Sequence, residues 1–226
     1  MKGNEKVVMR GVHIQPPRYL KDDFLGMAQS ITVEIFKSEI EGTCEELQMV
    51  LNELCFTGEF HLAPYLDLAR YAIDGDSSCL LAMATELKTG RGADLAFNAS
   101  VMLGLHELMG AFEEYHSGIN QSPALLLVMN MFWARIEIDK SRLGSDLAYS
   151  ISISEISLLA KMKPGSVRNY AVKGHAHYLP TTEGEHVSVK AENAHKWLLE
   201  RKGYVPTVLP KKKSERDALR LYLDDC

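Results

Sequence analysis

Residues 152–170 read SISEISLLAKMKPGSVRNY, and this stretch decides the fold. Its first residues have the spacing Ser152-x-x-Glu155, a capping box in which each side chain bonds the other residue's backbone amide at a helix start. Apolar residues at helical spacing follow, then a break at residues 161–163, and Pro164 is placed for the first turn of a second helix. Two short helices bury little apolar surface by themselves. The stretch therefore predicts a helix-turn-helix whose second helix protrudes to reach a groove.

The second helix and the residues after it extend this pattern. Val167 and Tyr170 are spaced to face the core, and polar side chains lie between them. The following sequence predicts a helix end at Gly174, a strand over 177–179, a turn at residues 183–184 and a strand over 187–189. A last helix then carries four residues on one apolar face: Ala191, Ala194, Trp197 and Leu198. We expect Trp197 to be a core residue, covered by the helix that carries Ile156 and Leu159.

The run ISLLAKMKPGSVRNY resembles the helix-turn-helix of winged DNA-binding domains of the MerR and excisionase type, and the resemblance covers about residues 150–205. It implies that Ser166, Arg168 and Asn169 face the major groove, where arginine pairs well with guanine and asparagine with adenine. It also implies that Lys161, Lys163 and Lys173 hold backbone phosphates. His175 and His177 are candidate phosphate donors, with plain hairpin surface as the alternative.

The chain departs from that family's pattern at two positions. Lys161 stands where a glycine is usual, so it has to accept a positive φ at a cost of about 1 kcal/mol. Lys163 stands where a serine or threonine cap is usual, and loss of a cap typically costs ~1 kcal/mol. Both lysines place positive charge beside a helix N-terminus, which phosphates favour. Lysine at these two positions therefore lowers stability and favours DNA binding.

The first two thirds of the chain predict an all-α region with short connections. The predicted helices span 19–40, 43–56 (opened by a capping box at Thr43 and Glu46), 65–73, 77–90, 93–115 and 122–139, after a short strand or arm at 7–14. The apolar run from residue 123 to 134 reads as a buried helix because it is too short for a bilayer, which needs about 20 residues.

Charge divides the chain at about the same place. Residues 1–149 carry 12 basic and 21 acidic residues, a net charge of −9, whereas residues 150–226 carry 13 basic and 9 acidic residues, a net of +4. This asymmetry suggests two units with different partners. We expect a mainly α protein with an acidic all-α oligomerisation or partner domain (1–146), a winged helix-turn-helix with a small β-hairpin (147–206), and a basic linker with a short C-terminal helix (207–226).

The remaining motifs give no sign of catalysis. HELMG (106–110) lacks the second histidine of a zinc protease site, and TGRGADLA (89–96) lacks the third glycine of a dinucleotide loop. The four scattered cysteines form no CxxC pair, which favours a reduced, cytoplasmic protein. We expect no enzyme activity, no catalytic residue, no metal, no cofactor and no membrane association.

These observations predict a sequence-specific double-stranded DNA-binding protein, acting as a homodimeric transcriptional regulator. One alternative is an excisionase-like DNA-bending factor of a mobile element. Another is a protein–protein interaction module whose helix-turn-helix binds no DNA. In the tail, the lysine run 211–213 either contacts phosphate or is a solvated linker, and Leu219, Tyr222 and Leu223 either pack back or join a dimer. Any small-molecule effector stays open.

Overall fold

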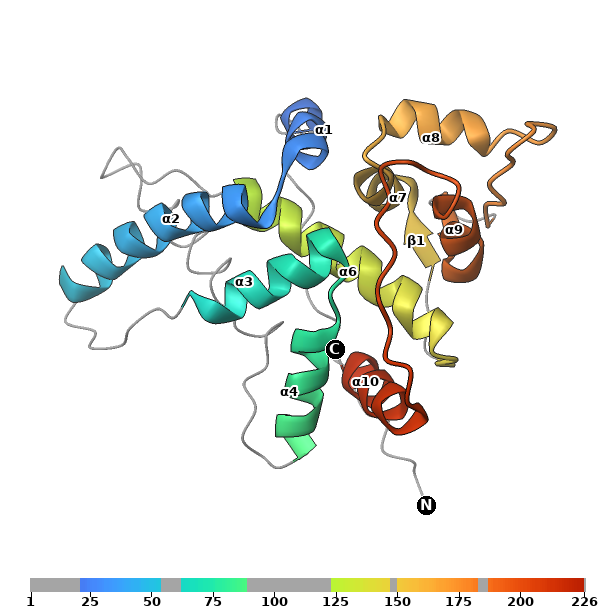
Figure 1. Ribbon diagram of the computed structural model, residues 1–226. Helices are drawn as coiled ribbons and strands as arrows, with labels where there is room; N and C mark the ends of the chain where they lie inside the picture. Colours follow the sequence, from blue (N-terminus) through green and yellow to red (C-terminus); the bar gives the residue numbers. More distant parts are fainter. Residues whose placement is uncertain (1–20, 54–61, 89–122, 147–149, 183–186, 226) are drawn as a thin grey trace, which may run out of the picture.

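The computed structural model describes residues 21–53, 62–88, 123–146, 150–182 and 187–225 (Figure 1). In these ranges the chain is mainly helical and has one two-stranded antiparallel sheet. Helix α6 (Pro123–Arg142) crosses the middle of the molecule, with α2 and α3 on one side, α7, β1 and α9 on the other, and α10 beside α4 (Figure 1). The predicted strand at 7–14, the predicted helix at 93–115 and the predicted turn at 183–184 lie outside the described residues.

The first two helices differ from the prediction. A break at Ile31 and Thr32 separates α1 (Lys21–Ser30) from α2 (Val33–Glu53), where the sequence predicted one helix over 19–40. Thr32 causes the new start, because its Oγ1 accepts a hydrogen bond from the Ile35 amide at 3.2 Å. The capping box predicted at Thr43 and Glu46 is wrong: both residues lie inside α2, which continues through them without a turn.

The next segment agrees with the helices predicted over 65–73 and 77–90. Helix α3 (Ala63–Ala69) passes into a π-helical turn, η2 (Arg70–Asp74), and ends at Gly75. Gly75 has φ +69°, and a Cβ there would lie 2.8 Å from the carbonyl oxygen of Pro206, so glycine is required both by conformation and by close packing. Helix α4 (Ser78–Lys88) confirms the helix predicted over 77–90.

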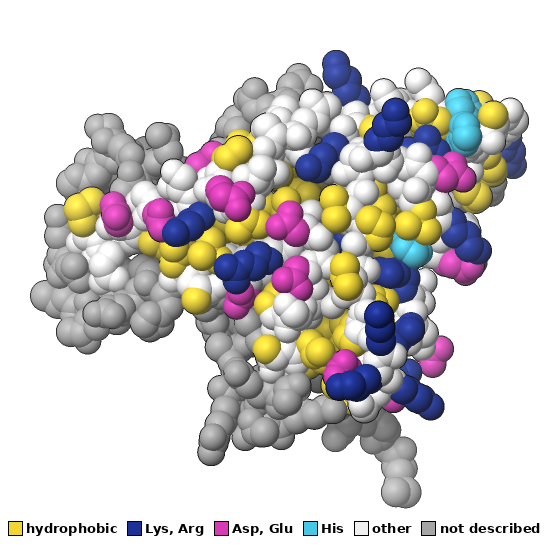
Figure 2. Space-filling model, in the orientation of Figure 1, with side chains coloured by type: hydrophobic (Ala, Val, Ile, Leu, Met, Phe, Trp, Pro, Cys, Tyr) yellow, Lys and Arg dark blue, Asp and Glu magenta, His cyan; other side chains and the backbone are white. Residues whose placement is uncertain are grey.

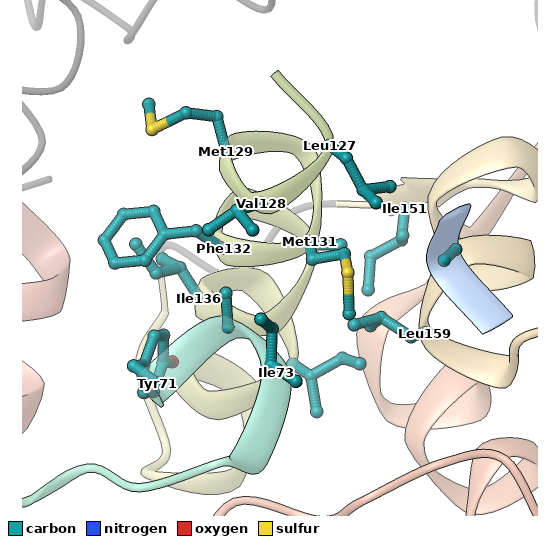
Figure 3. Close-up of a cluster of buried hydrophobic side chains, with 14 of the residues drawn as sticks. Tyr71, Ile73, Leu127, Val128, Met129, Met131, Phe132, Ile136, Ile151 and Leu159 are labelled. Atoms are coloured by element: carbon teal, nitrogen blue, oxygen red, sulfur yellow. The ribbon is translucent and has the colours of Figure 1, made fainter. Parts of the chain in front are cut away.

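Residues 124–134 of helix α6 are apolar except for Asn130, and none of them is exposed. Figure 3 shows Met129, Phe132 and Ile136 on the side toward Tyr71, and Leu127 and Met131 on the side toward Ile151 and Leu159. The helix packs against α2, α3 and η2 on the first side and against α7 and α9 on the second. A helix that is hydrophobic all round belongs in a core. The apolar run at 123–134, which is too short to span a bilayer, lies in the central helix of the hydrophobic core.

The C-terminal half contains the two predicted short helices and the closing helix. Its elements are β1 (Ser150–Ser152), α7 (Ile153–Ala160), α8 (Pro164–Tyr170), β2 (Ser188–Lys190), α9 (Ala191–Leu198) and α10 (Lys213–Asp225). All four predicted core residues of α9 are buried. In α10, Leu219, Tyr222 and Leu223 are buried and the helix packs against α4 and α6, so the tail stripe packs back onto the chain.

The strand prediction for the wing is wrong in one arm. Residues 177–179 form no strand: the Leu179 amide donates instead to the carbonyl oxygen of Tyr170 at 2.8 Å, at the end of α8. The second arm does form, as β2, but its partner is β1, with Ile151 opposite Val189. Thr182 forms an isolated bridge to Ser188 on the same strand. The small sheet therefore ties the start of α7 to the start of α9.

One cluster of buried hydrophobic side chains runs from Ala28 to Leu223 and crosses the boundary expected at residue 146. After α9 the chain turns back to the earlier helices. We call residues 202–209 the strap. Val208 in the strap forms a parallel bridge with Asp76, and its amide donates to the Gly75 carbonyl oxygen at 2.9 Å. The division into separate domains stays a prediction.

Candidate nucleic-acid interface

The first helix of the candidate site starts at the predicted capping box. The Ser152 amide donates to Glu155 Oε2 at 2.8 Å, and the Glu155 amide donates to Ser152 Oγ at 3.2 Å. These two bonds satisfy backbone donors that a helix start otherwise leaves without partners. The box therefore sets the first turn of α7, directly after strand β1.

The turn between the two helices has the positive φ that was expected at Lys161 from the resemblance to winged domains. Lys161 adopts φ 55° and ψ 40°, and it is the only non-glycine residue with positive φ in the described ranges. The amides of Lys161 and Met162 bond back to the carbonyl oxygens of Leu158 and Ser157, which closes the end of α7. A lysine therefore occupies a position where glycine is free of strain.

Replacing Lys161 with glycine should raise the stability of the chain. Removing the Cβ from a left-handed position relieves about 1 kcal/mol. Lys161→Ala is the matched control, because it removes the same charge and keeps the Cβ. Urea unfolding of the two full-length variants beside the wild type measures the difference. A Lys161→Gly variant no more stable than Lys161→Ala would show that the turn carries no strain.

The second helix is held by its apolar side and presents its polar side. Val167 is fully buried, while Tyr170 is half-buried and contacts the ring of Trp197 edge-on, with the centroids 5.2 Å apart. Arg168 and Asn169 are exposed, and Ser166 is half-buried. Helix α8 packs against α7 and lies at the upper edge of the molecule in Figure 1. Its polar residues are thus free to meet a partner in a groove.

The described basic side chains fall into two groups by their partners. Before residue 147, five basic side chains are engaged within the chain. Lys37, Arg70, Lys140 and Arg142 pair with carboxylates, and Arg135 donates to carbonyl and hydroxyl oxygens. After residue 150, the side chains of Lys161, Lys163, Arg168 and Lys173 have no ion pair or hydrogen bond with any described residue.

These free cations lie where the resemblance places phosphate and base contacts. Lys163 is exposed in the turn before α8, and Lys173 is exposed in the turn after it. Figure 2 shows Lys and Arg side chains along the right-hand part of this face, over the C-terminal elements. A cation without an internal carboxylate keeps its full charge for an external anion. The structure brings the predicted set to the two ends and the outer side of one protruding helix.

The two candidate histidines lie in the segment after α8 and not on it. His177 Nδ1 is 3.1 Å from Glu200 Oε2, and its backbone oxygen accepts a hydrogen bond from Trp197 Nε1. His175 contacts the Tyr170 ring, with the centroids 4.5 Å apart. Both are exposed. Their contacts hold this segment against Tyr170 and Trp197, which favours a surface role without phosphate contact, although no hairpin forms at residues 177–179.

Arg201 is a site residue that the sequence analysis did not identify. Its guanidinium lies 4.1 Å from the centroid of the Trp197 ring and 4.8 Å from that of Tyr170, so it covers the junction between the end of α8 and α9. Such contacts stabilise by about 0.5–2 kcal/mol each. The sequence signal was weak, because Arg201 lies four residues after Trp197 and beyond the end of α9.

The neighbouring surface of α9 gives a contrast. Lys196 Nζ lies 2.6 Å from Glu192 Oε1, and both side chains are exposed. The hydrogen bond from Lys196 and its charge lower the pKa of Glu192. Lys196 is therefore a cation of the same half whose charge is already compensated, which makes it a control position for DNA contacts.

The described residues contain no group of three or more His, Cys, Asp or Glu side chains arranged to hold a metal ion. None of the described helices combines the length and apolar character that crossing a bilayer requires. Compared with known proteins, the chain matches no family model, no curated protein and no solved structure. The resemblance to winged domains of the MerR and excisionase type thus stays a prediction.

Proposed function

We propose that this chain is a sequence-specific double-stranded DNA-binding regulator that acts as a homodimer. The observation that carries the proposal is the protruding helix α8, whose outer side presents the side chains of Arg168 and Asn169 with no hydrogen bond or ion pair to another described residue. In a helix-turn-helix, the second helix enters the major groove, and its outward side chains read base edges. Arginine there pairs with guanine and asparagine with adenine.

The distribution of paired and free cations supports the same proposal. Lys161, Lys163 and Lys173 flank α8 and would contact backbone phosphates, which fixes the register of the helix in the groove. The earlier helices carry the excess negative charge and would stay away from DNA. They are the part available for dimerisation or for a protein partner.

Dimerisation follows from the small size of the reading surface. One helix-turn-helix reads only a few base pairs, and two linked copies gain affinity through effective concentration. A symmetric dimer would then select a palindromic site. Sedimentation of the full-length protein with and without a selected duplex measures the copy number in each state.

The direct experiment is selection of bound sequences from a random DNA library with the full-length protein, followed by titration against salt. One enriched, palindromic sequence and a steep loss of affinity with salt are expected, because several phosphate contacts release counterions. A chain that enriches no sequence and binds without salt dependence would be the protein-interaction module instead. Bending of the selected duplex by the protein would favour the excisionase-like role.

Arg168→Ala should lower affinity for the selected site by about 1–3 kcal/mol and leave affinity for mixed-sequence DNA nearly unchanged. Base contacts specify, whereas phosphate contacts bind all sequences alike. Because Arg168 is exposed, the variant should fold normally. Arg70→Ala is the control, since Arg70 is an exposed arginine paired with Asp67 on the far helices. Equal losses on both duplexes would make Arg168 a phosphate contact and shift the docking register.

A further inference from the structure

The strap passes directly over the turn of the helix-turn-helix. A Cβ on Gly203 would lie 2.5 Å from the carbonyl oxygen of Ala160 and 2.9 Å from Cβ of Lys161. Real Cβ atoms do not approach backbone oxygen so closely, so only glycine allows the strap to lie here. Figure 1 shows the chain after α9 passing across the end of α7 before it runs down to α10.

This contact puts a further lysine beside the two lysines of the turn. Lys202 directly precedes Gly203 and is exposed. We propose that Lys202 is a third DNA-phosphate contact, which acts with Lys161 and Lys163 as one group that we call the turn lysines. The inference rests on the proposed function, because it assigns this group to the DNA backbone that flanks the groove occupied by α8.

The backbone around Lys202 is held on both sides. On one side, the Arg201 guanidinium stacks on Trp197 and Tyr170, the last residue of α8. On the other side, Gly203 lies against the end of α7, and Tyr204, whose ring lies 5.7 Å from the Arg135 guanidinium, is buried. Lys202 therefore has a fixed base between two parts of the helix-turn-helix, and only its flexible stem costs entropy when it binds phosphate.

The charge of Lys202 is uncompensated by the described residues. Its acidic neighbour Glu200 is engaged elsewhere, with His177 Nδ1 at 3.1 Å and Arg201 Nη2 at 3.3 Å. Neither Lys161 nor Lys163 has a carboxylate partner in the described ranges. Like charges on neighbouring segments favour an anion that binds near all of them. A run of backbone phosphates supplies such anions at regular spacing.

The test is the salt dependence of DNA binding by full-length Lys202→Ala, measured by titration on a mixed-sequence duplex and on the selected duplex. Losing one phosphate contact should reduce the slope of log affinity against log salt by ~1 and weaken both duplexes several-fold and equally. Lys202→Arg should retain the wild-type slope. Lys196→Ala, which removes a cation paired with Glu192, should leave the slope unchanged.

Gly203→Ala tests the placement without removing a charge. The added methyl group must move the strap away from the turn, so this variant should lose the contribution of Lys202, and Lys202→Ala should weaken it no further. Thermal melting by circular dichroism checks that the variant folds, and the Lys202→Ala result stands if it does not.

The outcomes separate this inference from the proposed function. If Lys163→Ala reduces the slope and Lys202→Ala does not, the strap lies off the DNA and the inference is wrong, while the proposed function stands. If the wild type shows no salt-dependent binding to either duplex, the proposed function fails and the inference fails with it. Equal slopes for Lys202→Ala and Lys196→Ala also reject the inference.

Discussion

Trp197→Ala is expected to destabilise the chain by about 3–5 kcal/mol and to abolish DNA binding only as a consequence of unfolding. The Trp197 side chain is 4% exposed, and its Nε1 donates to the His177 carbonyl oxygen at 3.1 Å. Its ring contacts are with Tyr170 and with the Arg201 guanidinium. Truncation would leave a cavity between α8 and α9 and an unpaired carbonyl group, both of which are costly.

The measurement is denaturant unfolding of the full-length variant, followed by circular dichroism, beside its affinity for mixed-sequence DNA. Trp197→Phe is the control. This variant keeps a large ring and loses the hydrogen bond, so its free energy of unfolding should fall by about 1–2 kcal/mol. It should still bind DNA at low denaturant concentrations. A Trp197→Ala variant that melts like the wild type yet fails to bind would make the indole a stacking platform for bases and would reject its role in the core.

The location of Trp197 was predictable because it followed from local spacing. Ala191, Ala194 and Leu198 share its face, and all are buried. The covering groups were only partly predictable. Helix α7 packs against α9, as expected, but the rings and charge that contact the indole come from Tyr170 and Arg201. Periodicity shows which face of a helix is buried and carries no information on which distant residue covers it.

The same distinction between local and distant contacts explains which other features of the candidate site could be predicted and which could not. The capping box at Ser152, Pro164 at the first turn of α8 and the positive φ of Lys161 all depend on neighbouring residues, and the structure has all three. Strand β1 is three residues long, and its partner lies 38 residues later, at β2. Such a pairing leaves no periodic pattern in the sequence, because only Ile151 and Val189 face the core.

Helix α2 shows the limit of motif reading. A capping-box sequence forms a cap only where a helix starts, and at Thr43 the chain is already inside α2, which began ten residues earlier at Val33. Thr32 has no matching glutamate three residues later, yet it caps α2 through its hydroxyl. The strap was equally hidden, since its path depends on Gly75 and Gly203, where close approach of two backbones requires glycine. Gly203 lies in no recognisable motif, and Gly75 is recognisable only as a helix end.

The strap also gives the second large effect, through Arg135 of α6. This side chain is only 1% exposed. It has no carboxylate partner in the described ranges, and its partners are neutral oxygen atoms. Its Nε donates to the Ala72 carbonyl oxygen at 3.2 Å, and its Nη1 donates to the Val205 carbonyl oxygen at 2.8 Å and to Thr207 Oγ1 at 3.0 Å. The rings of Tyr71 and Tyr204 flank the guanidinium at 6.0 and 5.7 Å.

A neighbouring network on α6 holds the same segment. The buried Asp139 accepts hydrogen bonds from Tyr71 Oη and Arg142 Nη1, both at 2.8 Å. Arg142 Nη1 also donates to the Thr207 carbonyl oxygen at 3.1 Å. Two arginines of one helix thus bond the strap to the central helix. These bonds act in addition to the direct packing of α7 and α9 on α6.

Arg135→Ala should therefore destabilise the chain by about 3–5 kcal/mol, because it leaves buried carbonyl and hydroxyl groups without a donor and opens a cavity between two tyrosine rings. Arg135→Met fills most of the same volume without a buried charge, and it should cost less. Arg70→Ala removes an exposed arginine of η2 and should change stability by less than about 1 kcal/mol. Denaturant unfolding of the three full-length variants measures the order of their stabilities. An Arg135→Ala variant as stable as Arg70→Ala would mean that the hydrogen bonds of Arg135 add nothing to stability and that the strap is held by its other contacts.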